Sequence, residues 1–220
     1  METLNPLTKE RSTSQKVAET LKDAIFRGEL QLGERLVEAN IAKSLHVSIT
    51  PVRHAFTQLA NEGLINVVPY KETHVVQINE TFVNEVFSVR TPLELMAAEL
   101  ACPRLTPADC NSLEDLARAM DTAAHSGKNE EMAKYDIQFH GLFYERSQHT
   151  LLLHIWKTIQ ARIQLLQSYG RTHHQPAPAG EVEQRHMKII KAVRLGDSEL
   201  LKKRVKEHID TGKRMVLKRL

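Results

Sequence analysis

The sequence predicts a mainly α-helical protein in which an N-terminal winged helix-turn-helix precedes a C-terminal all-α antiparallel bundle of about six helices. Apolar residues recur at helical spacing along most of the chain, and β-branched residues gather in one short stretch, at 64–78. After residue 79, glycine and proline divide the chain into long helical segments. We therefore expect two domains, at 1–78 and 79–220.

The N-terminal domain is expected to contain three helices followed by a hairpin. Gly28 ends the apolar stripe of the first helix. The third helix is expected to begin at Thr50, as its N-cap, with Pro51 in the first helical position. The predicted elements are helices 17–26, 38–45 and 50–63, and strands 64–68 and 74–78.

The C-terminal domain is expected to be helical throughout. Thr106-Pro107 and Asp197-Ser198 have the residue types that begin helices. Glycines stand where helices are expected to end, at Gly127, Gly170 and Gly196. The predicted helices are 80–101, 107–126, 129–147, 150–169, 179–195 and 197–217.

Composition excludes some classes of protein. No apolar run approaches the roughly 20 residues that cross a bilayer, and the polar N-terminus does not look like a secretory signal. We therefore expect a cytoplasmic protein without a membrane partner. Cys102 and Cys110 lack metal-motif spacing, and in that compartment we expect reduced thiols, with a disulfide as the alternative.

The turn at 46–49 suggests a helix-turn-helix that binds double-stranded DNA. The second helix would enter the major groove, with Ser48, Thr50 and Arg53 nearest the DNA. Tyr70 and Lys71, in the hairpin turn, would touch the backbone or the minor groove. Residues 1–78 carry nine Lys/Arg and nine Asp/Glu, so positive charge must gather on one face. The alternative is a helical packing module that binds no nucleic acid.

Four polar residues of the C-terminal domain interrupt apolar helix faces: Asp136, His140, His186 and His208. Asp136 and His140 are four residues apart and share a face. Unpaired polar groups inside a bundle are costly, so something must satisfy all four together. One carboxylate and three imidazoles suit a divalent metal, with zinc or nickel favoured. A hydrogen-bonded polar cluster without metal is the alternative.

The N-terminal domain resembles the GntR family of bacterial regulators. The resemblance rests on Gly28, Leu30 and Gly33, on Val-Ser-Ile-Thr-Pro-Val-Arg at 47–53, and on Glu-Gly-Leu at 62–64. Two departures stand out: Ile49 replaces the family's usual Arg, and 71–73 lacks the usual wing glycine. The resemblance implies DNA binding but leaves the operator sequence open.

The C-terminal domain resembles the FCD ligand-binding domain of the FadR branch of that family. Arg90 and Glu94 match its opening pattern, although Pro92 lies between them and is expected to kink the helix. The four polar residues match its metal-binding members. The resemblance implies a small carboxylate effector beside the metal, with Arg90 and Arg162 as candidate ligand-binding arginines. The alternatives are that Arg90 pairs with Glu94 and that Arg162 is solvated.

Together these features predict a homodimeric transcription regulator, expected to be a repressor, whose operator affinity is modulated by a small organic acid. It is not expected to be an enzyme, because no general base or nucleophile is placed by motif. A metal-dependent enzyme remains one alternative, since metal-bound water is a nucleophile. A structural metal-binding bundle without an effector is another.

Overall fold

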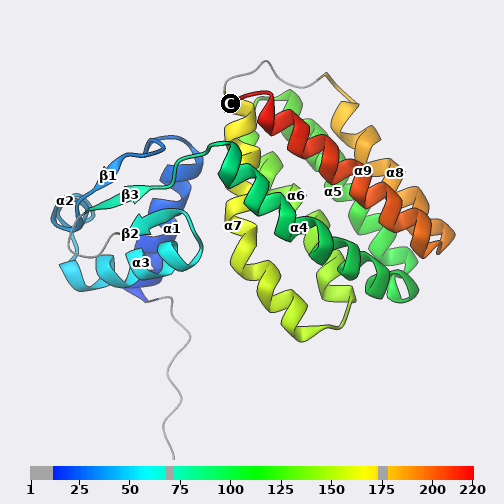
Figure 1. Cartoon of the computed structure of the whole chain (residues 1–220), viewed down its shortest axis with the longest axis horizontal. Coiled ribbons are helices and arrows are strands. Elements are labelled where there is room, and N and C mark those ends of the chain that lie inside the picture. The colour runs from blue at the N-terminus through cyan, green and yellow to red at the C-terminus, as the bar shows by residue number, and fades with distance from the viewer. Residues whose placement is uncertain (1–11, 68–71, 173–177) are drawn as a thin grey trace, which may run out of the picture. The chain divides into compact units, whose positions relative to one another are not determined.

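The computed structural model describes residues 12–67, 72–172 and 178–220 (Figure 1). The chain divides between Val76 and Gln77 into two compact units, each described below by itself. The mainly helical fold class predicted from the sequence is confirmed in both. None of the described helices combines the length and the apolar character of a membrane span.

The N-terminal unit contains three helices and a small sheet. Its elements are α1 (Thr13–Phe26), β1 (Arg35–Leu36), α2 (Glu38–Ser44), α3 (Ile49–Asn61), β2 (Ile65–Val67) and β3 (Thr73–Val75). α1 begins earlier than predicted, because Ser12 and Gln15 form a reciprocal capping box ahead of the apolar stripe.

The sheet has three strands rather than the two of the predicted hairpin. β3 lies in the centre and pairs antiparallel with both neighbours, opposing His74 to Arg35 and Val75 to Ile65. The two-residue strand β1 is too short to show an alternating pattern, which is why the sequence did not reveal it.

The turn between α2 and α3 differs in one respect from the sequence prediction. The N-cap of α3 is Ser48, not Thr50, and the helix therefore begins two residues earlier. His46 adopts a positive φ of 53°, which lets the Val47 amide donate to the Ala42 carbonyl at 3.0 Å. This tight turn brings α3 back against α1 and α2.

The C-terminal unit is a helical bundle whose described residues include six α-helices. They are α4 (Glu80–Ala101), α5 (Pro107–His125), α6 (Asn129–Arg146), α7 (Thr150–Thr172), α8 (Glu181–Leu195) and α9 (Ser198–Leu217), with a short 3₁₀ turn, η1 (Cys102–Arg104), after α4. The prediction that Gly170 ends a helix is wrong, because α7 continues to Thr172. Glycine inside a helix costs only about 1 kcal/mol.

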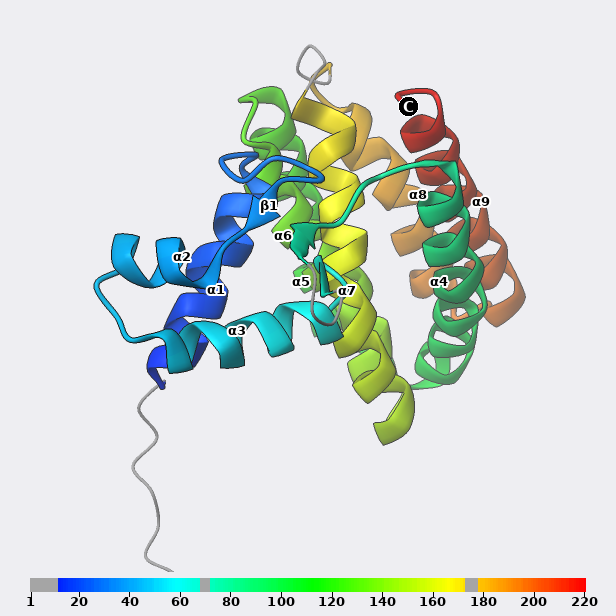
Figure 2. The same cartoon turned by 60° about the vertical axis from the view of Figure 1, so that its left-hand side comes forward.

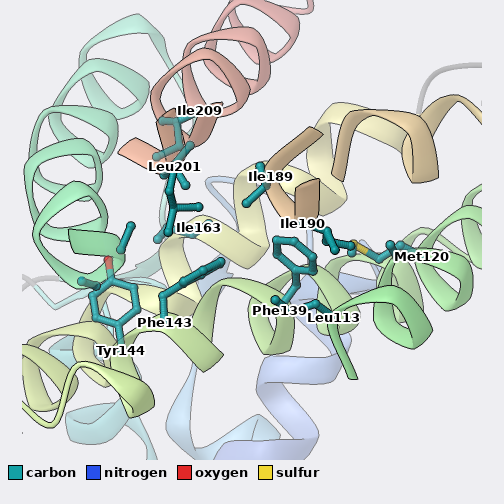
Figure 3. Close-up of a cluster of buried hydrophobic side chains, with 14 of the residues drawn as sticks. Leu113, Met120, Phe139, Phe143, Tyr144, Ile163, Ile189, Ile190, Leu201 and Ile209 are labelled. Carbon is teal, nitrogen blue, oxygen red and sulfur yellow. The ribbon is translucent and has the colours of Figure 1, made fainter. Parts of the chain in front are cut away.

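The core of this unit is built around α6. Figure 3 shows Phe139 and Phe143 of α6 among apolar side chains of α5, α8 and α9. α4 and α9 run side by side in opposite directions (Figure 2), with Lys202 near the start of α9 paired to Glu99 near the end of α4 at 3.1 Å. Cys102 and Cys110 are buried free thiols.

A buried carboxylate joins the start of α5 to the end of α6. Asp109 Oδ1 accepts hydrogen bonds from Arg146 Nε at 3.0 Å and Nη2 at 2.8 Å. Its Oδ2 accepts from the Thr106 amide at 2.9 Å, which completes the capping box of α5. These donors outweigh burial and lower the pKa of Asp109 from 3.8 to about 2.

We expect Asp109→Asn to destabilise the bundle by about 1–2 kcal/mol at neutral pH, because a charged cap and an ion pair with two hydrogen bonds are lost together. A depressed pKa stabilises the folded state above the unfolded value of 3.8 and loses that effect as pH falls toward about 2. Urea unfolding should therefore show the difference shrinking between about pH 4 and pH 2. Asp115→Asn, on the exposed face of α5, is the control and should change stability by less than about 0.5 kcal/mol. A constant difference at all pH values would contradict this assignment.

Candidate functional site

Four side chains from three helices meet inside the C-terminal unit. Asp136 and His140 come from α6, His186 from α8 and His208 from α9. One ligand atom of each lies within 4.8 Å of those of the other three. The ring centroids of His186 and His208 are 4.5 Å apart, and those of His140 and His208 are 5.1 Å apart. The structure thus gathers the four residues that the sequence singled out, and we call them the ligand cluster.

Carboxylate and carbonyl oxygens orient two of the three histidine rings of the ligand cluster. His186 Nδ1 lies 2.8 Å from the Val182 carbonyl oxygen, to which it donates, so that Nε2 faces Asp136 Oδ1 at 3.2 Å. His140 Nδ1 contacts Glu94 Oε1. Partners on the far nitrogen fix the tautomer of a metal-binding histidine and raise its basicity.

Neither ring nitrogen of His140 makes a hydrogen bond within the described residues, although Nδ1 contacts the Glu94 carboxylate. Its Nε2 is buried without a hydrogen-bond partner in the described part of the chain, and the Asp136 Oδ2 atom is 3.6 Å away. An unsatisfied buried nitrogen is costly unless something binds it. A cation among the four ligand atoms would remove that cost.

The pKa values of His208 and His140 are shifted in opposite directions. Burial lowers the pKa of His208 well below its usual value, which leaves that ring neutral and its lone pair available. Burial also lowers the pKa of His140, but the carboxylates of Glu94 and Asp136 act more strongly together and raise it to about 9. Any cation that binds there must displace the His140 proton.

These donors fit a divalent metal of the zinc or nickel type. Three imidazoles and one carboxylate are the ligand types such ions prefer, and neighbouring oxygen atoms orient two of the imidazoles, those of His140 and His186. Asp136, His140, His186 and His208 would hold it. A bound metal would supply a Lewis acid to which an anionic group can attach.

Arg90 lies on α4, beside the cluster. Its Nε donates to Glu94 Oε2 at 2.9 Å, so the predicted pairing exists. Its Nη2 is buried with no hydrogen-bond acceptor among the described residues, and Asp136 Oδ2 is 3.9 Å away. α4 runs without a break through Pro92, which keeps Arg90 and Glu94 one turn apart on one face.

A cavity of about 70 Å³ adjoins the cluster. Arg90, Asp136, His186 and His208 line it, and so do three residues that the sequence did not single out: Gln167, Arg185 and Arg219. Arg162 is not among the lining residues; its Nη1 lies 3.5 Å from the Thr158 carbonyl on its own helix, at the surface. Nothing in the local pattern distinguishes Arg185 from the solvated arginines of α8 and α9.

The start of α8 is held by a carboxylate from another helix. Asp121 of α5 accepts hydrogen bonds from the backbone amides of Gly180 at 2.7 Å, Val182 at 3.1 Å and Glu183 at 3.3 Å. These amides have no partner within α8 itself. Asp121 therefore fixes the helix that carries Arg185 and His186, although it is about 60 residues away in sequence, where no short motif could reveal it.

The N-terminal unit presents an exposed face on α3. Ile49, Thr50, Arg53, His54 and Thr57 are exposed there, whereas Val52, Ala55 and Phe56 on the other side are buried. Arg53 Nε donates to Glu38 Oε2 of α2 at 2.7 Å. The Ser48 hydroxyl makes no capping hydrogen bond. The first turns of α1 and α3 line one surface hollow that contains Ser12, Ser14, Ser48 and Thr50.

Tyr70 and Lys71, the predicted contacts of the wing, lie outside the described residues. Ile49, which replaces the arginine usual in the GntR family, is 41% exposed.

Family models match both units. The model of the FCD domain matches residues 85–211, and that of the bacterial regulatory proteins of the gntR family matches residues 13–75. The chain belongs to the GntR family and carries an FCD domain. This GntR/FCD protein is therefore a transcription regulator rather than an enzyme.

The curated relatives of this GntR/FCD protein are transcription regulators, and the similarity extends over most of each chain. The transcriptional regulator McbR of Escherichia coli is 29% identical over 188 residues, which cover 86% of this chain and 85% of McbR. The "Probable D-xylose utilization operon transcriptional repressor" of Paenarthrobacter nicotinovorans is 27% identical over 206 residues, covering 92% and 89%. The solved structure of E. coli McbR/YncC, 26% identical, superposes with a TM-score of 0.81 over 95% of this chain and 99% of that one.

We expect Glu94→Gln to weaken zinc binding about 10–100-fold, because the orienting carboxylate of His140 is lost. Zinc affinity of the unaltered chain should rise with pH until His140 no longer holds a proton, near pH 9. Without the Glu94 charge the pKa of His140 falls, so the affinity should level off at a lower pH. Competition with a chromophoric chelator across this pH range measures both effects.

Glu99→Gln is the matched control, because Glu99 is on the same helix but lies at the surface. Circular dichroism of the metal-free variants separates loss of zinc from loss of fold. Equal zinc affinity and pH profile in Glu94→Gln and the unaltered chain would refute the orienting role of Glu94.

Proposed function

We propose that the protein represses transcription from an operator that it binds as a homodimer, and that a small organic acid changes its operator affinity. In this proposal the ligand cluster holds a divalent metal, zinc or nickel, and the acid attaches to the metal with one carboxylate held by Arg90. The single observation that supports it best is the Nη2 atom of Arg90, buried beside the cavity without a hydrogen-bond acceptor in the described chain. A carboxylate between Arg90 and a metal would satisfy both.

The exposed face of α3 supports the DNA-binding part of the proposal. Ser48 and Thr50 offer hydroxyls at a helix N-terminus, where phosphate oxygens bind well. Arg53 is oriented by Glu38 and is long enough to reach a base edge. Ile49 presents an apolar side chain, which suits the methyl group of thymine rather than a guanine edge. In the proposal Tyr70 and Lys71 of the wing add backbone or minor-groove contacts.

The surface of α4 supports a homodimer. Val89 and Met96 are seven residues apart on one face and are 46% and 42% exposed. Two apolar residues at this spacing suit packing against a second helix. A dimer would present two copies of α3 to half-sites about one DNA turn apart, and light scattering of the purified chain tests the assembly.

We expect Arg53→Ala to weaken binding to a duplex selected from a random pool by about 1–3 kcal/mol, the worth of a lost base contact. Fluorescence anisotropy measures the affinity at fixed salt. Arg27→Ala is the matched control, since Arg27 also forms an exposed ion pair, with Glu29, but lies at the end of α1. Equal losses in both variants would show that general charge, not this helix face, binds the DNA.

We expect Asp136→Asn to lose zinc and the response to acids while keeping operator binding without acid, because it alters only the C-terminal unit. Operator titrations with and without a panel of carboxylic acids should show a change of about 1–3 kcal/mol in the unaltered protein and none in the variant. Asp115→Asn provides the control. If no acid of a broad panel changed the operator affinity of the unaltered zinc-loaded protein, acid sensing would be refuted. The metal would then have a structural role only.

A further inference from the structure

The cavity beside the ligand cluster contains more positive charge than one carboxylate requires. Besides Arg90, it is lined by Arg185 of α8 and by Arg219, just after α9. The side chain of Arg185 is 22% exposed, and its Nε is buried without a hydrogen-bond partner in the part of the chain that the structure describes. This guanidinium therefore has unused hydrogen-bonding capacity inside the cavity.

The neighbours of Arg185 are poor partners for a cation. Its Nη1 lies 3.0 Å from Met215 Sδ, and a thioether is a weak acceptor. Its Nη2 is 3.7 Å from Glu181 Oε1, which is beyond hydrogen-bond distance. Arg219 forms no ion pair within the described ranges, and the burial of Arg219 together with the charge of Arg185 lowers its pKa. Two guanidinium groups thus lie near each other, and within the described ranges Glu181 is the one carboxylate that forms an ion pair with either of them.

The charged groups around the cavity do not balance one another. The Arg90 charge is matched by Glu94, and Asp136 contributes one negative charge. Glu181, whose Oε1 is 3.7 Å from Arg185 Nη2, contributes another, so Arg185, Arg219 and a divalent metal leave a formal charge of +2. A monocarboxylate would leave half of that charge unneutralised, whereas a dianion would neutralise it, and unpaired charge in a partly buried site is unfavourable.

The two positive regions are also separated. His208 of the ligand cluster and Met215, which contacts Arg185, are seven residues apart on α9. This spacing corresponds to about two helical turns, or roughly 10 Å along the axis. An acid with an anionic group at each end suits two positive regions that are spaced in this way.

We propose that the effector carries two anionic groups: a carboxylate that binds the metal and Arg90, and a second carboxylate or phosphate that binds Arg185 and Arg219. This inference rests on the proposed function, because it assumes an acid in the same cavity. It assigns Arg185 and Arg219 as the residues that select dianionic over monoanionic acids. Bidentate guanidinium–carboxylate pairing supplies the selectivity.

The test measures binding of matched acids to the zinc-loaded full chain by isothermal titration calorimetry. The diacids are succinate, glutarate and adipate, and each is compared with its monoacid, butanoate, pentanoate or hexanoate. 4-Phosphonobutyrate distinguishes a phosphate-type second group from a carboxylate. We expect at least one dianion to bind about tenfold or more tightly than its monoacid, and Arg185→Gln and Arg219→Gln each to reduce that ratio to about threefold or less.

Arg194→Gln is the control on α8, since Arg194 pairs with Glu114 at the surface; it should preserve the ratio. Zinc affinity is measured in parallel, because Arg185 adjoins His186 in sequence and Arg185→Gln can disturb the metal. Arg219 is eleven residues beyond His208 in sequence, so Arg219→Gln provides a second variant for the same test. Equal affinity for dianions and monoanions, or an unchanged ratio in both variants, would overturn the inference while leaving the acid sensor intact. Failure of every acid to bind would remove the effector site itself, and this inference with it.

Discussion

The carboxylate of Glu94 is fully buried, and the arrangement of the C-terminal unit depends on how its charge is compensated. Burial alone would make this charge very unfavourable. Arg90 on the same helix and His140 on α6 supply the compensation, and they outweigh burial so that the pKa of Glu94 stays below its usual value. The same contacts fix the ring of His140 and aim Arg90 toward Asp136. One buried charge therefore links the geometry of the ligand cluster to the position of α4.

α4 is also the helix that directly follows the N-terminal unit in sequence. The Asn79 side chain caps it, and only Val76 to Asn79 separate it from β3. A ligand that changed the pairing of Arg90 would act on a helix covalently continuous with the DNA-binding unit. Coupling between two sites requires an element whose state both of them influence, and under the proposed function α4 is that element.

The sequence predicted the residues whose chemistry conflicts with their local pattern. Asp136, His140, His186 and His208 interrupt apolar stripes, and this conflict marked them before their proximity was known. The six helices of the bundle were predicted for a similar reason, because amphipathic periodicity, capping threonine and aspartate, and terminal glycines agree with one another along that part of the chain.

Features that depend on distant contacts were not predicted. Arg185 has the same local pattern as a solvated arginine, and only the contact with Met215 places it in the cavity. Asp121 caps a helix about 60 residues away, and β1 becomes a strand only through its pairing with β3. Arg162 is the opposite case. It was a candidate ligand-binding residue and lies on α7, which contributes Gln167 to the cavity, but Arg162 itself does not line the cavity. In each case tertiary packing decided what local sequence left open.

The distribution of the ligand cluster along the chain has a consequence for how the protein is made. Its members come from α6, α8 and α9, and the last of them, His208, lies in the final helix. During synthesis from the N-terminus, the winged unit and most of the bundle leave the ribosome before the fourth ligand exists. The cluster is therefore completed only after α9 has emerged and docked against α4. A metal held by all four ligands would therefore require α9 to be in place, and four-ligand metal binding would then report that this helix had docked.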